Sequence, residues 1–195
     1  MDVERIGKMM DFLREVDKLK SVYRKHELTD YSRAESDTDH SWHMGLFAMT
    51  LHGDLESEVD LLHSLKMIVV HDLVEVVAGD TYAYDEEGKV GQAQREEAAA
   101  HKLYSILPED LYSEFYILWR EFESGTSAEA SYARSMDTLQ ALAQNYFTGG
   151  RIWRENGITE AMSRERCHEG INFDETLNQV FELLYERAKG MWGED

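Results

Sequence analysis

Apolar residues recur every three or four positions along most of the chain, the spacing that places them on one face of an α-helix. The first such series lies near the N-terminus: Ile6, Met9, Leu13, Val16 and Leu19. Later series predict further helices at about 38–54, 57–78, 93–107, from Pro108 onward, after Gly125 and over 172–191. The polar segments 23–39 and 81–91 are expected to form loops. Since no segment alternates between apolar and polar residues as a strand does, the pattern predicts an all-α fold of about seven helices.

Residues with capping preferences mark several of the predicted helix ends. Ser57 suits the N-cap of the third helix, and Gly79 suits its C-terminal stop. Pro108 is tolerated in the first turn of the fifth helix. Thr126 and Glu129 have the spacing of a capping box at the start of the sixth helix.

No repeat, low-complexity tract or Pro/Gly/Ser-rich linker divides the 195 residues, so we expect a single domain over 1–195. The chain has 39 acidic and 20 basic residues and a net charge of −19. Such a surface repels nucleic-acid backbones and anionic membranes, so we expect neither nucleic acid nor a membrane as a partner. The single cysteine, Cys167, excludes an intramolecular disulfide and suits a reducing compartment. Residues 1–20 are charged throughout, without the apolar core of a signal peptide, so we expect a cytoplasmic protein.

The segment 67–80, MIVVHDLVEVVAGD, places three ionisable residues inside an apolar helix. At about 100° per residue, Asp72 lies about 100° and Glu75 about 40° from His71, so the three share one flank. Ionisable groups on a buried helix are costly unless they are paired or bind a metal. Imidazole and carboxylate suit a divalent first-row ion, and the lack of a nearby cysteine disfavours a structural zinc site. This segment alone leaves a metal site and an ordinary hydrogen-bonded histidine equally open.

A metal held by His71 and Asp72 needs further ligands from other helices. His40 and His43, in SDTDHSWHMGL, begin a predicted helix with three-residue spacing, and Asp137 lies among apolar helical positions. Each of them alone is more often structural, Asp137 as an exposed helix residue and His43 as a cap or a stacking ring. Together with the doublet, they are candidates for the remaining ligands.

A histidine, a His-Asp doublet and a distant helical aspartate, in this order, resemble the H…HD…D signature of the HD-domain metal-dependent phosphohydrolases. Further similarities to that family, and to its subgroup of bacterial 5′-deoxynucleotidases, are HDxxE at 71–75, Gly79-Asp80, SRAESDTDHSWH at 32–43, REE at 95–97 and LPEDL at 107–111. The resemblance spans about 8–150, so we expect this part to form the core and 151–195 to form a C-terminal helical extension.

The resemblance implies a helical bundle with a buried metal site made by four ligands: His40, His71, Asp72 and Asp137. Glu75 occupies the position of the family's catalytic carboxylate. One divalent ion per chain is implied, and Mn, Co, Mg, Fe and Zn all accept this donor set. His43 is not a ligand in the family's pattern and is expected to support a ligand or the packing. Relatives are commonly homodimers, so a homodimer is expected.

Charge balance predicts where phosphate-binding residues lie. Two neutral histidines, two aspartates and a divalent cation sum to zero, so a phosphomonoester dianion needs positive side chains nearby. The candidates are Arg24, Lys25 and Arg33, in the polar segment before His40. In the deoxynucleotidases an arginine of this segment touches the phosphate, and ungapped counting places that position at Lys25, beside Arg24. The alternative is a solvated basic patch. Asp80 is a candidate to accept a hydrogen bond from a sugar hydroxyl, or a simple turn residue.

These features predict a metal-dependent phosphohydrolase that acts on (deoxy)nucleoside 5′-monophosphates. The first alternative, a (deoxy)nucleoside triphosphate hydrolase, would be expected to carry more basic residues. A di-iron oxygenase needs extra histidines between the doublet and the last aspartate, where only His101 lies. A catalytically silent regulatory HD protein is a further alternative, although all four predicted ligands and Glu75 are present.

Overall fold

The computed structural model describes residues 2–193, except for the side chains at positions 169 and 171, and it is mainly helical. The α-helices are α1 (Val3–Val16), α2 (Asp37–Leu51), α3 (Leu61–Val70), α4 (Glu75–Ala78), α5 (Gln92–Tyr104), α6 (Glu109–Ser124), α7 (Ala128–Phe147), α8 (Arg151–Glu155), α9 (Glu160–Ile171) and α10 (Glu175–Arg187). Three 3₁₀ helices join them: η1 (Asp17–Ser21), η2 (His52–Asp54) and η3 (His71–Val74). The predicted all-α class is confirmed, with more helical segments than the seven expected.

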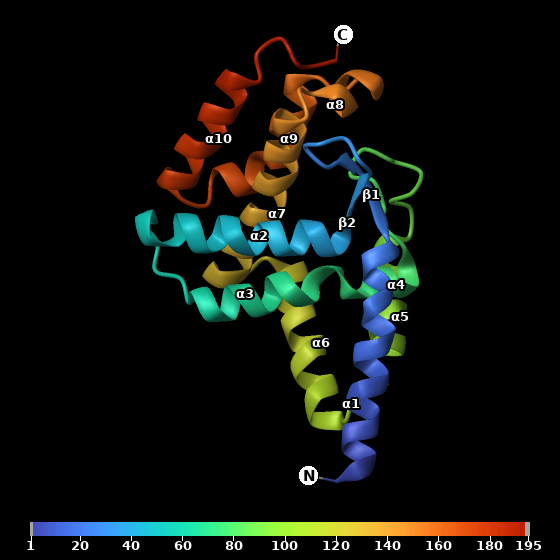
Figure 1. Ribbon diagram of the computed structural model, residues 1–195. Coiled ribbons are helices and arrows are strands. Elements are labelled where there is room, and N and C mark those ends of the chain that lie inside the picture. Colours follow the sequence, from blue (N-terminus) through green and yellow to red (C-terminus); the bar gives the residue numbers. More distant parts are fainter. Residues whose placement is uncertain (1, 194–195) are drawn as a thin grey trace.

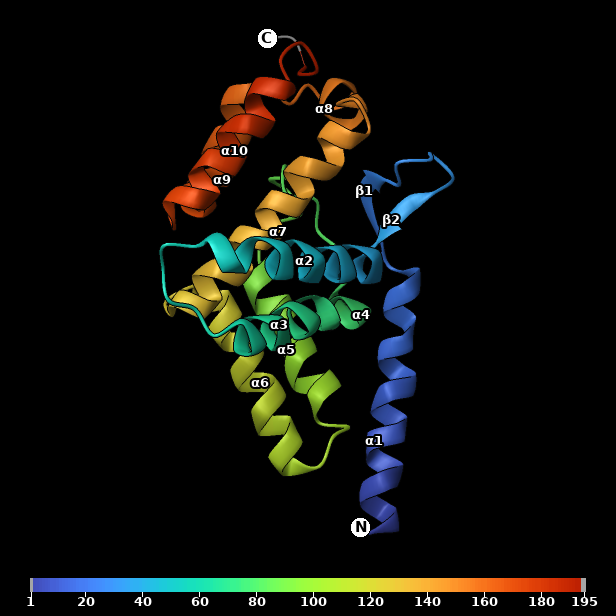
Figure 2. The ribbon, with the colours of Figure 1, turned by 60° about the vertical axis from the view of Figure 1, so that its left-hand side comes forward.

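The long helix α7 forms the centre of the core, and α2, α3, α6, α9 and α10 pack around it. Its Met136, Leu139 and Ala143 side chains have no exposed surface. Figure 1 shows α2 and α3 side by side across α7. In Figures 1 and 2 the C-terminal helices α8–α10 lie at one end of the molecule and the N-terminal half of α1 at the other. Within residues 2–193, no helix has the length and apolar character needed to cross a membrane.

The segment 23–39 is not a simple loop, and the expectation of no strands is wrong. Strands β1 (Tyr23–Glu27) and β2 (Ala34–Ser36) form a small antiparallel sheet in which Tyr23 pairs with Ser36 and Glu27 with Ala34. Burial alternates along the first four residues of β1, because Arg24 and His26 point inward while Tyr23 and Lys25 are exposed. The inward residues are polar, so a search for apolar–polar alternation misses this strand.

The third predicted helix is wrong at its start and in its continuity. It begins at Leu61, where Asp60 rather than Ser57 is the N-cap and accepts hydrogen bonds from the amides of residues 62 and 63. After Val70 the chain tightens into the 3₁₀ helix η3, which carries His71 and Asp72, before the short helix α4. A 3₁₀ helix turns about 120° per residue, so side chains here do not keep α-helical angles. Gly79 ends α4 with a φ of 78°, as its predicted stop requires.

The cap of α7 is also one residue from the predicted position. Ser127, not Thr126, accepts a hydrogen bond from the amide of Ala130 at 3.1 Å. Pro108 does precede the first turn of α6, as expected. The segment 151–171, part of the expected C-terminal helical extension but without predicted helix bounds, forms α8 and α9, and these two helices reach the functional site.

Candidate active site

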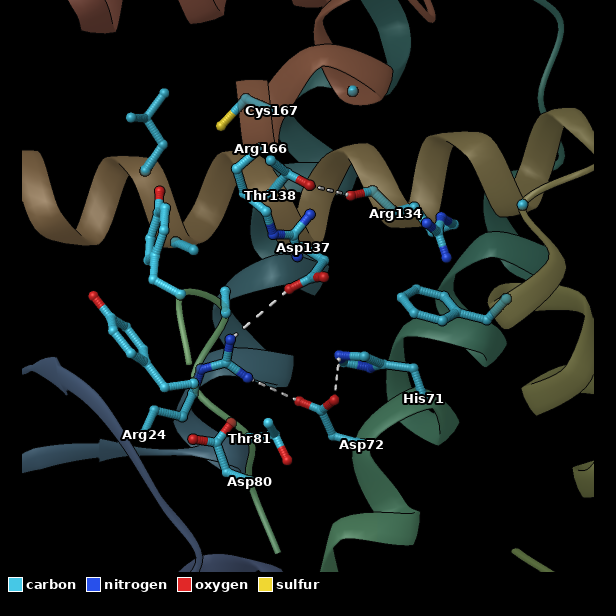
Figure 3. Close-up of a pocket in the computed structure, with 18 of the residues that line it drawn as sticks. Arg24, His71, Asp72, Asp80, Thr81, Arg134, Asp137, Thr138, Arg166 and Cys167 are labelled. Carbon is cyan, nitrogen blue, oxygen red and sulfur yellow. Dashed lines mark hydrogen bonds and ion pairs between the residues drawn. The ribbon is translucent and has the colours of Figure 1, made fainter. Parts of the chain in front are cut away.

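Three separate parts of the chain bring four metal-ligand candidates together. His40 lies in the first turns of α2, whose start is held by a capping box between Ser36 and Asp39. The ligand atoms of His40, His71 and Asp72 lie within 4.8 Å of one another. Asp137, from the middle of α7, places Oδ1 3.0 Å from Nε2 of His40. The structure therefore brings all four predicted ligands to one place, and Figure 3 shows three of them facing a common cavity.

Both histidines direct their Nε2 atoms to this centre. Nδ1 of His71 donates to the carbonyl of Ile68 at 2.7 Å, and Nδ1 of His40 donates to Oε1 of Gln140 at 2.5 Å. Nε2 of His71 is buried without a hydrogen-bond partner, although Oδ1 of Asp72 is 3.0 Å away. A histidine that donates through one ring nitrogen presents the other as a metal ligand. The donor set thus fits a divalent cation.

Electrostatics at the centre favour a bound positive charge. Burial alone would lower the pKa of His71, but the Asp72 and Asp137 carboxylates raise it to about 9. Burial alone would raise the pKa of Asp137, but its hydrogen bond with His40 and the charge of Arg24 lower it below its usual range. These shifts favour a protonated His71 and an ionised Asp137. A divalent cation can replace the proton of His71 and bind the same imidazole and carboxylate groups.

Arg24 extends from β1 into this group of carboxylates. One guanidinium nitrogen, Nη1, lies 3.2 Å from Oδ2 of Asp72 and 3.7 Å from Oδ1 of Asp37, and Nη2 lies 4.0 Å from Oδ1 of Asp137. Burial alone would lower the pKa of Arg24, but these carboxylates raise it, so the guanidinium stays charged. Figure 3 shows the side chain crossing the cavity toward Asp72 and Asp137.

The other predicted substrate contacts have different surroundings. Lys25 is exposed and lines the cavity, as does the half-buried Asp80. Arg33 does not line it, because its guanidinium forms a two-bond ion pair with Asp39 at 2.5 and 3.1 Å. The geometry therefore supports Arg24, Lys25 and Asp80 as candidates and leaves Arg33 outside the site.

A second acidic group adjoins the ligands and includes a residue that the sequence did not single out. Oxygen atoms of Asp37, Glu75 and Asp80 lie within 4.8 Å of one another. Asp37 is completely buried, and its carboxylate interacts with the Glu75 carboxyl group and with Arg24. Burial, together with the charges of Asp72 and Asp37, raises the pKa of Glu75 and so favours its protonated form. The available signal was position alone, since Asp37 precedes His40 by about one helical turn.

His43 lies beside the ligands without joining them. Its Nδ1 is 3.3 Å from Nε2 of Gln140, and its ring packs against Phe47 with the centroids 4.9 Å apart. Gln140 thus bridges His40, His43 and Glu35, whose Oε1 accepts from Gln140 Nε2 at 2.7 Å. These contacts agree with a supporting role for His43.

A cavity of about 820 Å³ opens beside the ligands. Besides the predicted residues, α5, α6, α7, α8, α9 and the loop after Asp80 contribute to its walls. The residues from that loop and from α7–α9 include Tyr82, Tyr84, Arg134, Leu142, Asn145, Trp153, Ser163, Arg166 and Cys167. Figure 3 shows Arg166 pointing from α9 into the cavity. The sequence named none of these residues as site residues, because none of them belongs to a recognised motif.

Comparisons with known proteins agree with this geometry. The family model described as HD domain matches residues 16–176. The human 5′-deoxynucleotidase HDDC2 is 34% identical over 137 residues, which cover 70% of this chain and 66% of the human protein. The mouse HDDC2 is 32% identical over 137 residues, which cover 70% of this chain and 67% of that protein. The matched segment thus spans about two thirds of these relatives.

One solved structure is similar over nearly the whole chain. It is a predicted metal-dependent phosphohydrolase from Magnetospirillum magnetotacticum, with 33% identity and a TM-score of 0.86. The similarity covers 98% of this chain and 100% of that one. The likeness therefore extends to the C-terminal helices, beyond the region that carries the recognised motifs.

Proposed function

The chain belongs to the HD domain family, and from this premise we propose that it is a metal-dependent phosphohydrolase that converts (deoxy)nucleoside 5′-monophosphates into nucleoside and phosphate. The similar proteins named 5′-deoxynucleotidase support the substrate class. The observation that carries the proposal is the convergence of two histidine Nε2 atoms and two carboxylates from α2, η3 and α7 beside a cavity of about 820 Å³. That volume is in the range of small-molecule sites.

We assign one divalent ion per chain to His40, His71, Asp72 and Asp137. When bound, such an ion polarises a phosphoryl oxygen and lowers the pKa of water, which makes attack at phosphorus possible near neutral pH. Mn, Co, Mg, Fe and Zn all remain candidates, because mixed imidazole and carboxylate sites accept each of them.

The chain's own residues account for binding and proton transfer in this proposal. With a divalent ion the four ligands sum to zero charge, so the phosphate dianion relies on the Arg24 guanidinium and the Lys25 ammonium. Glu75 lines the cavity with Oε2 buried, and its raised pKa favours the protonated form. It donates its proton to the departing 5′ oxygen, and Asp80 accepts a hydrogen bond from the sugar.

A phosphate-release screen tests the function. Nucleoside and deoxynucleoside 5′-monophosphates are incubated with the metal-free protein plus Mn, Co, Mg, Fe or Zn ions, and products are separated by chromatography. We expect inorganic phosphate and nucleoside, and no activity from Asp72→Ala, which removes a ligand. Release of intact triphosphate from nucleoside triphosphates, with no phosphate from monophosphates, would instead establish the triphosphohydrolase alternative.

An exposed apolar surface supports a homodimer as part of the proposal. Trp42, Leu46 and Met49 are exposed at helical spacing along α2, and Leu62 and Val69 are exposed on the adjacent α3. Large exposed apolar surfaces commonly mark protein interfaces. Light scattering coupled to gel filtration should give twice the chain mass of 22.6 kDa, and Trp42→Glu should give the monomer mass.

A further inference from the structure

Asn145 lines the cavity far along α7 from the ligands and carries a buried polar atom without a hydrogen-bond partner. Its Nδ2 donates to the carbonyl of Ala141 at 3.0 Å, while Oδ1 is buried and without a hydrogen-bond partner among the described residues. The residue is 5% exposed and lines the cavity. If the Asn145 amide were rotated by 180°, its Oδ1 would face the carbonyl oxygen of Ala141, and two acceptors would be in contact. The hydrogen bond from Nδ2 therefore identifies Oδ1 as the free acceptor.

The cavity follows α7 from the ligands to this acceptor. Asp137, Thr138, Ala141, Leu142 and Asn145 line it in succession, a stripe along one side of the helix. The eight residue steps from Asp137 to Asn145 rise about 12 Å along the helix axis. If the phosphate of a nucleoside monophosphate lies at the metal ligands, the opposite end of the molecule lies near Asn145. The extended length of a nucleoside monophosphate suits this span.

The surroundings of Asn145 suit a flat ring with an N–H donor at its edge. Leu142 and the buried Trp153 supply apolar wall, and Tyr84 and Cys167 line the same cavity. His26 adds Nδ1, which has no hydrogen-bond partner within residues 2–193 and lies 4.0 Å from Oε2 of Glu35, and the residue is 9% exposed. Its strand lies against this end of α7, because Gln144 donates to the carbonyl of Glu27 at 2.5 Å. Apolar walls with a few polar groups that fix orientation are typical of ligand pockets.

We propose that the part of the cavity between Asp137 and Asn145 holds the nucleobase, and that Oδ1 of Asn145 accepts a hydrogen bond from an N–H group of the base. This inference rests on the proposed function, since it takes the phosphate to lie at the metal ligands. All four common bases carry N–H donors on the edge away from the sugar. Asn145 therefore distinguishes substrates with a base from those without one, rather than one base from another.

The test compares substrates that share the phosphate and sugar but differ in the base. Hydrolysis of dAMP, dCMP, dGMP and TMP is compared with that of 2-deoxyribose 5-phosphate in the wild type, Asn145→Leu and Asn145→Asp. Leucine keeps a similar volume without an acceptor, so kcat/KM for the nucleotides should fall about three- to tenfold. The value for 2-deoxyribose 5-phosphate should stay within about twofold. Asn145→Asp retains an oxygen acceptor but has no donor for the Ala141 carbonyl, so it should recover part of the loss.

Two results would overturn the inference: an unchanged preference for nucleotides in Asn145→Leu, or an equal loss on both kinds of substrate with aspartate giving no recovery. Melting temperature and manganese affinity of each variant identify a merely structural effect. Calorimetric titration with deoxyadenosine measures binding at the base site independently of catalysis. If the wild type releases phosphate from no substrate, the proposed function fails. The base site would still be supported if Asn145→Leu binds deoxyadenosine more weakly than the wild type does. Equal binding by the two proteins would reject the base site.

Discussion

His40 on α2 and Asp137 on α7 are 97 residues apart in the chain, yet Nε2 of the first lies 3.0 Å from Oδ1 of the second. Contact between α2 and α7 in the core makes this pairing possible. The pairing joins the first and the last of the four ligand candidates and closes the site around η3. Its geometry and charge lead to the first prediction.

Asp137→Asn should abolish tight metal binding. The amide has nearly the shape of the carboxylate but no negative charge, so the site loses a ligand charge while its packing is retained. The loss should exceed the ~10–100-fold that removing an outer hydrogen-bond partner of a ligand costs. Calorimetric titration of metal-free protein with Mn²⁺ measures it. Asp110→Asn, which alters only an exposed ion pair with Arg5, is the control and should bind like the wild type.

Gln140→Leu should weaken metal binding without removing a ligand. Gln140 is fully buried, accepts from His40 Nδ1 at 2.5 Å and donates to Glu35 at 2.7 Å, so it sets both the ring orientation and the tautomer of His40. We expect manganese affinity to fall ~10–100-fold. Glu35→Gln keeps an oxygen acceptor for Gln140 and should lose much less. Equal affinities for wild type and Gln140→Leu would show that His40 needs no such support.

Glu75→Gln should separate metal binding from turnover. The side chain keeps its size, and Glu75 is not one of the four ligands, so manganese affinity should remain within a few fold. Because the amide cannot donate an acidic proton, kcat should fall by about 10²–10⁴, the usual contribution of a general acid. Phosphate release at saturating substrate gives kcat, and calorimetry gives the metal affinity. Full activity in this variant would remove Glu75 from the mechanism.

The doublet and its partners were predictable because they break a pattern. His71 and Asp72 interrupt an apolar helix, and the motif order around them identifies His40 and Asp137 as partners. The local geometry was not predictable in the same way. The change from α3 to η3 falls after Val70, and no glycine or proline marks it.

Other parts of the site were hidden for physical reasons. Charge balance identified Arg24 as a candidate, but hydrophobic periodicity could not detect the strand that turns Arg24 and His26 inward, because both face a polar centre. Asp37 lies in a polar segment that the sequence pattern predicts to be a loop. In the structure the capping box at Ser36 starts α2 at Asp37. Asn145 and Trp153 become site residues only because α8 and α9 fold back over α7, a long-range arrangement that local patterns do not contain.

Arg24→Met should make stability depend more strongly on metal. Arg24 lies within 4.0 Å of Asp37, Asp72 and Asp137, so its removal leaves buried carboxylates without a counter-charge. Leaving a buried charge unpaired costs about 3–5 kcal/mol, which corresponds to a melting temperature at least ~5 °C lower in metal-free buffer. Saturating Mn²⁺ should restore more of the melting temperature in this variant than it adds to the wild type.

Scanning calorimetry with chelator and with Mn²⁺ measures both effects of Arg24→Met. Arg33→Met is the matched control, because its ion pair with Asp39 is largely exposed and should contribute less than about 1 kcal/mol. The explanation by counter-charge is wrong if Mn²⁺ raises the melting temperatures of wild type and Arg24→Met by the same amount.

Asp174→Asn should remove a pH-dependent part of the stability that lies outside the active site. The buried Asp174 carboxylate accepts from the amides of Glu56 at 3.1 Å, Ser57 at 2.9 Å and Thr176 at 2.9 Å, and so ties the loop before α3 to the start of α10. Burial alone would raise the pKa of Asp174, but these hydrogen bonds lower it.

A carboxyl whose folded pKa lies below its unfolded value of about 3.9 adds stability above that pH, and the contribution disappears as the pH falls through the folded pKa. We therefore expect Asp174→Asn to be less stable than the wild type by about 1–2 kcal/mol at pH 7 in urea unfolding, with the difference shrinking below about pH 4. Asp11→Asn, at an exposed ion pair on α1, should differ from the wild type by less than about 1 kcal/mol at pH 7. A difference between wild type and Asp174→Asn that stays constant from pH 7 to pH 3 would mean that the carboxylate charge contributes nothing and that the lost stability comes from shape alone.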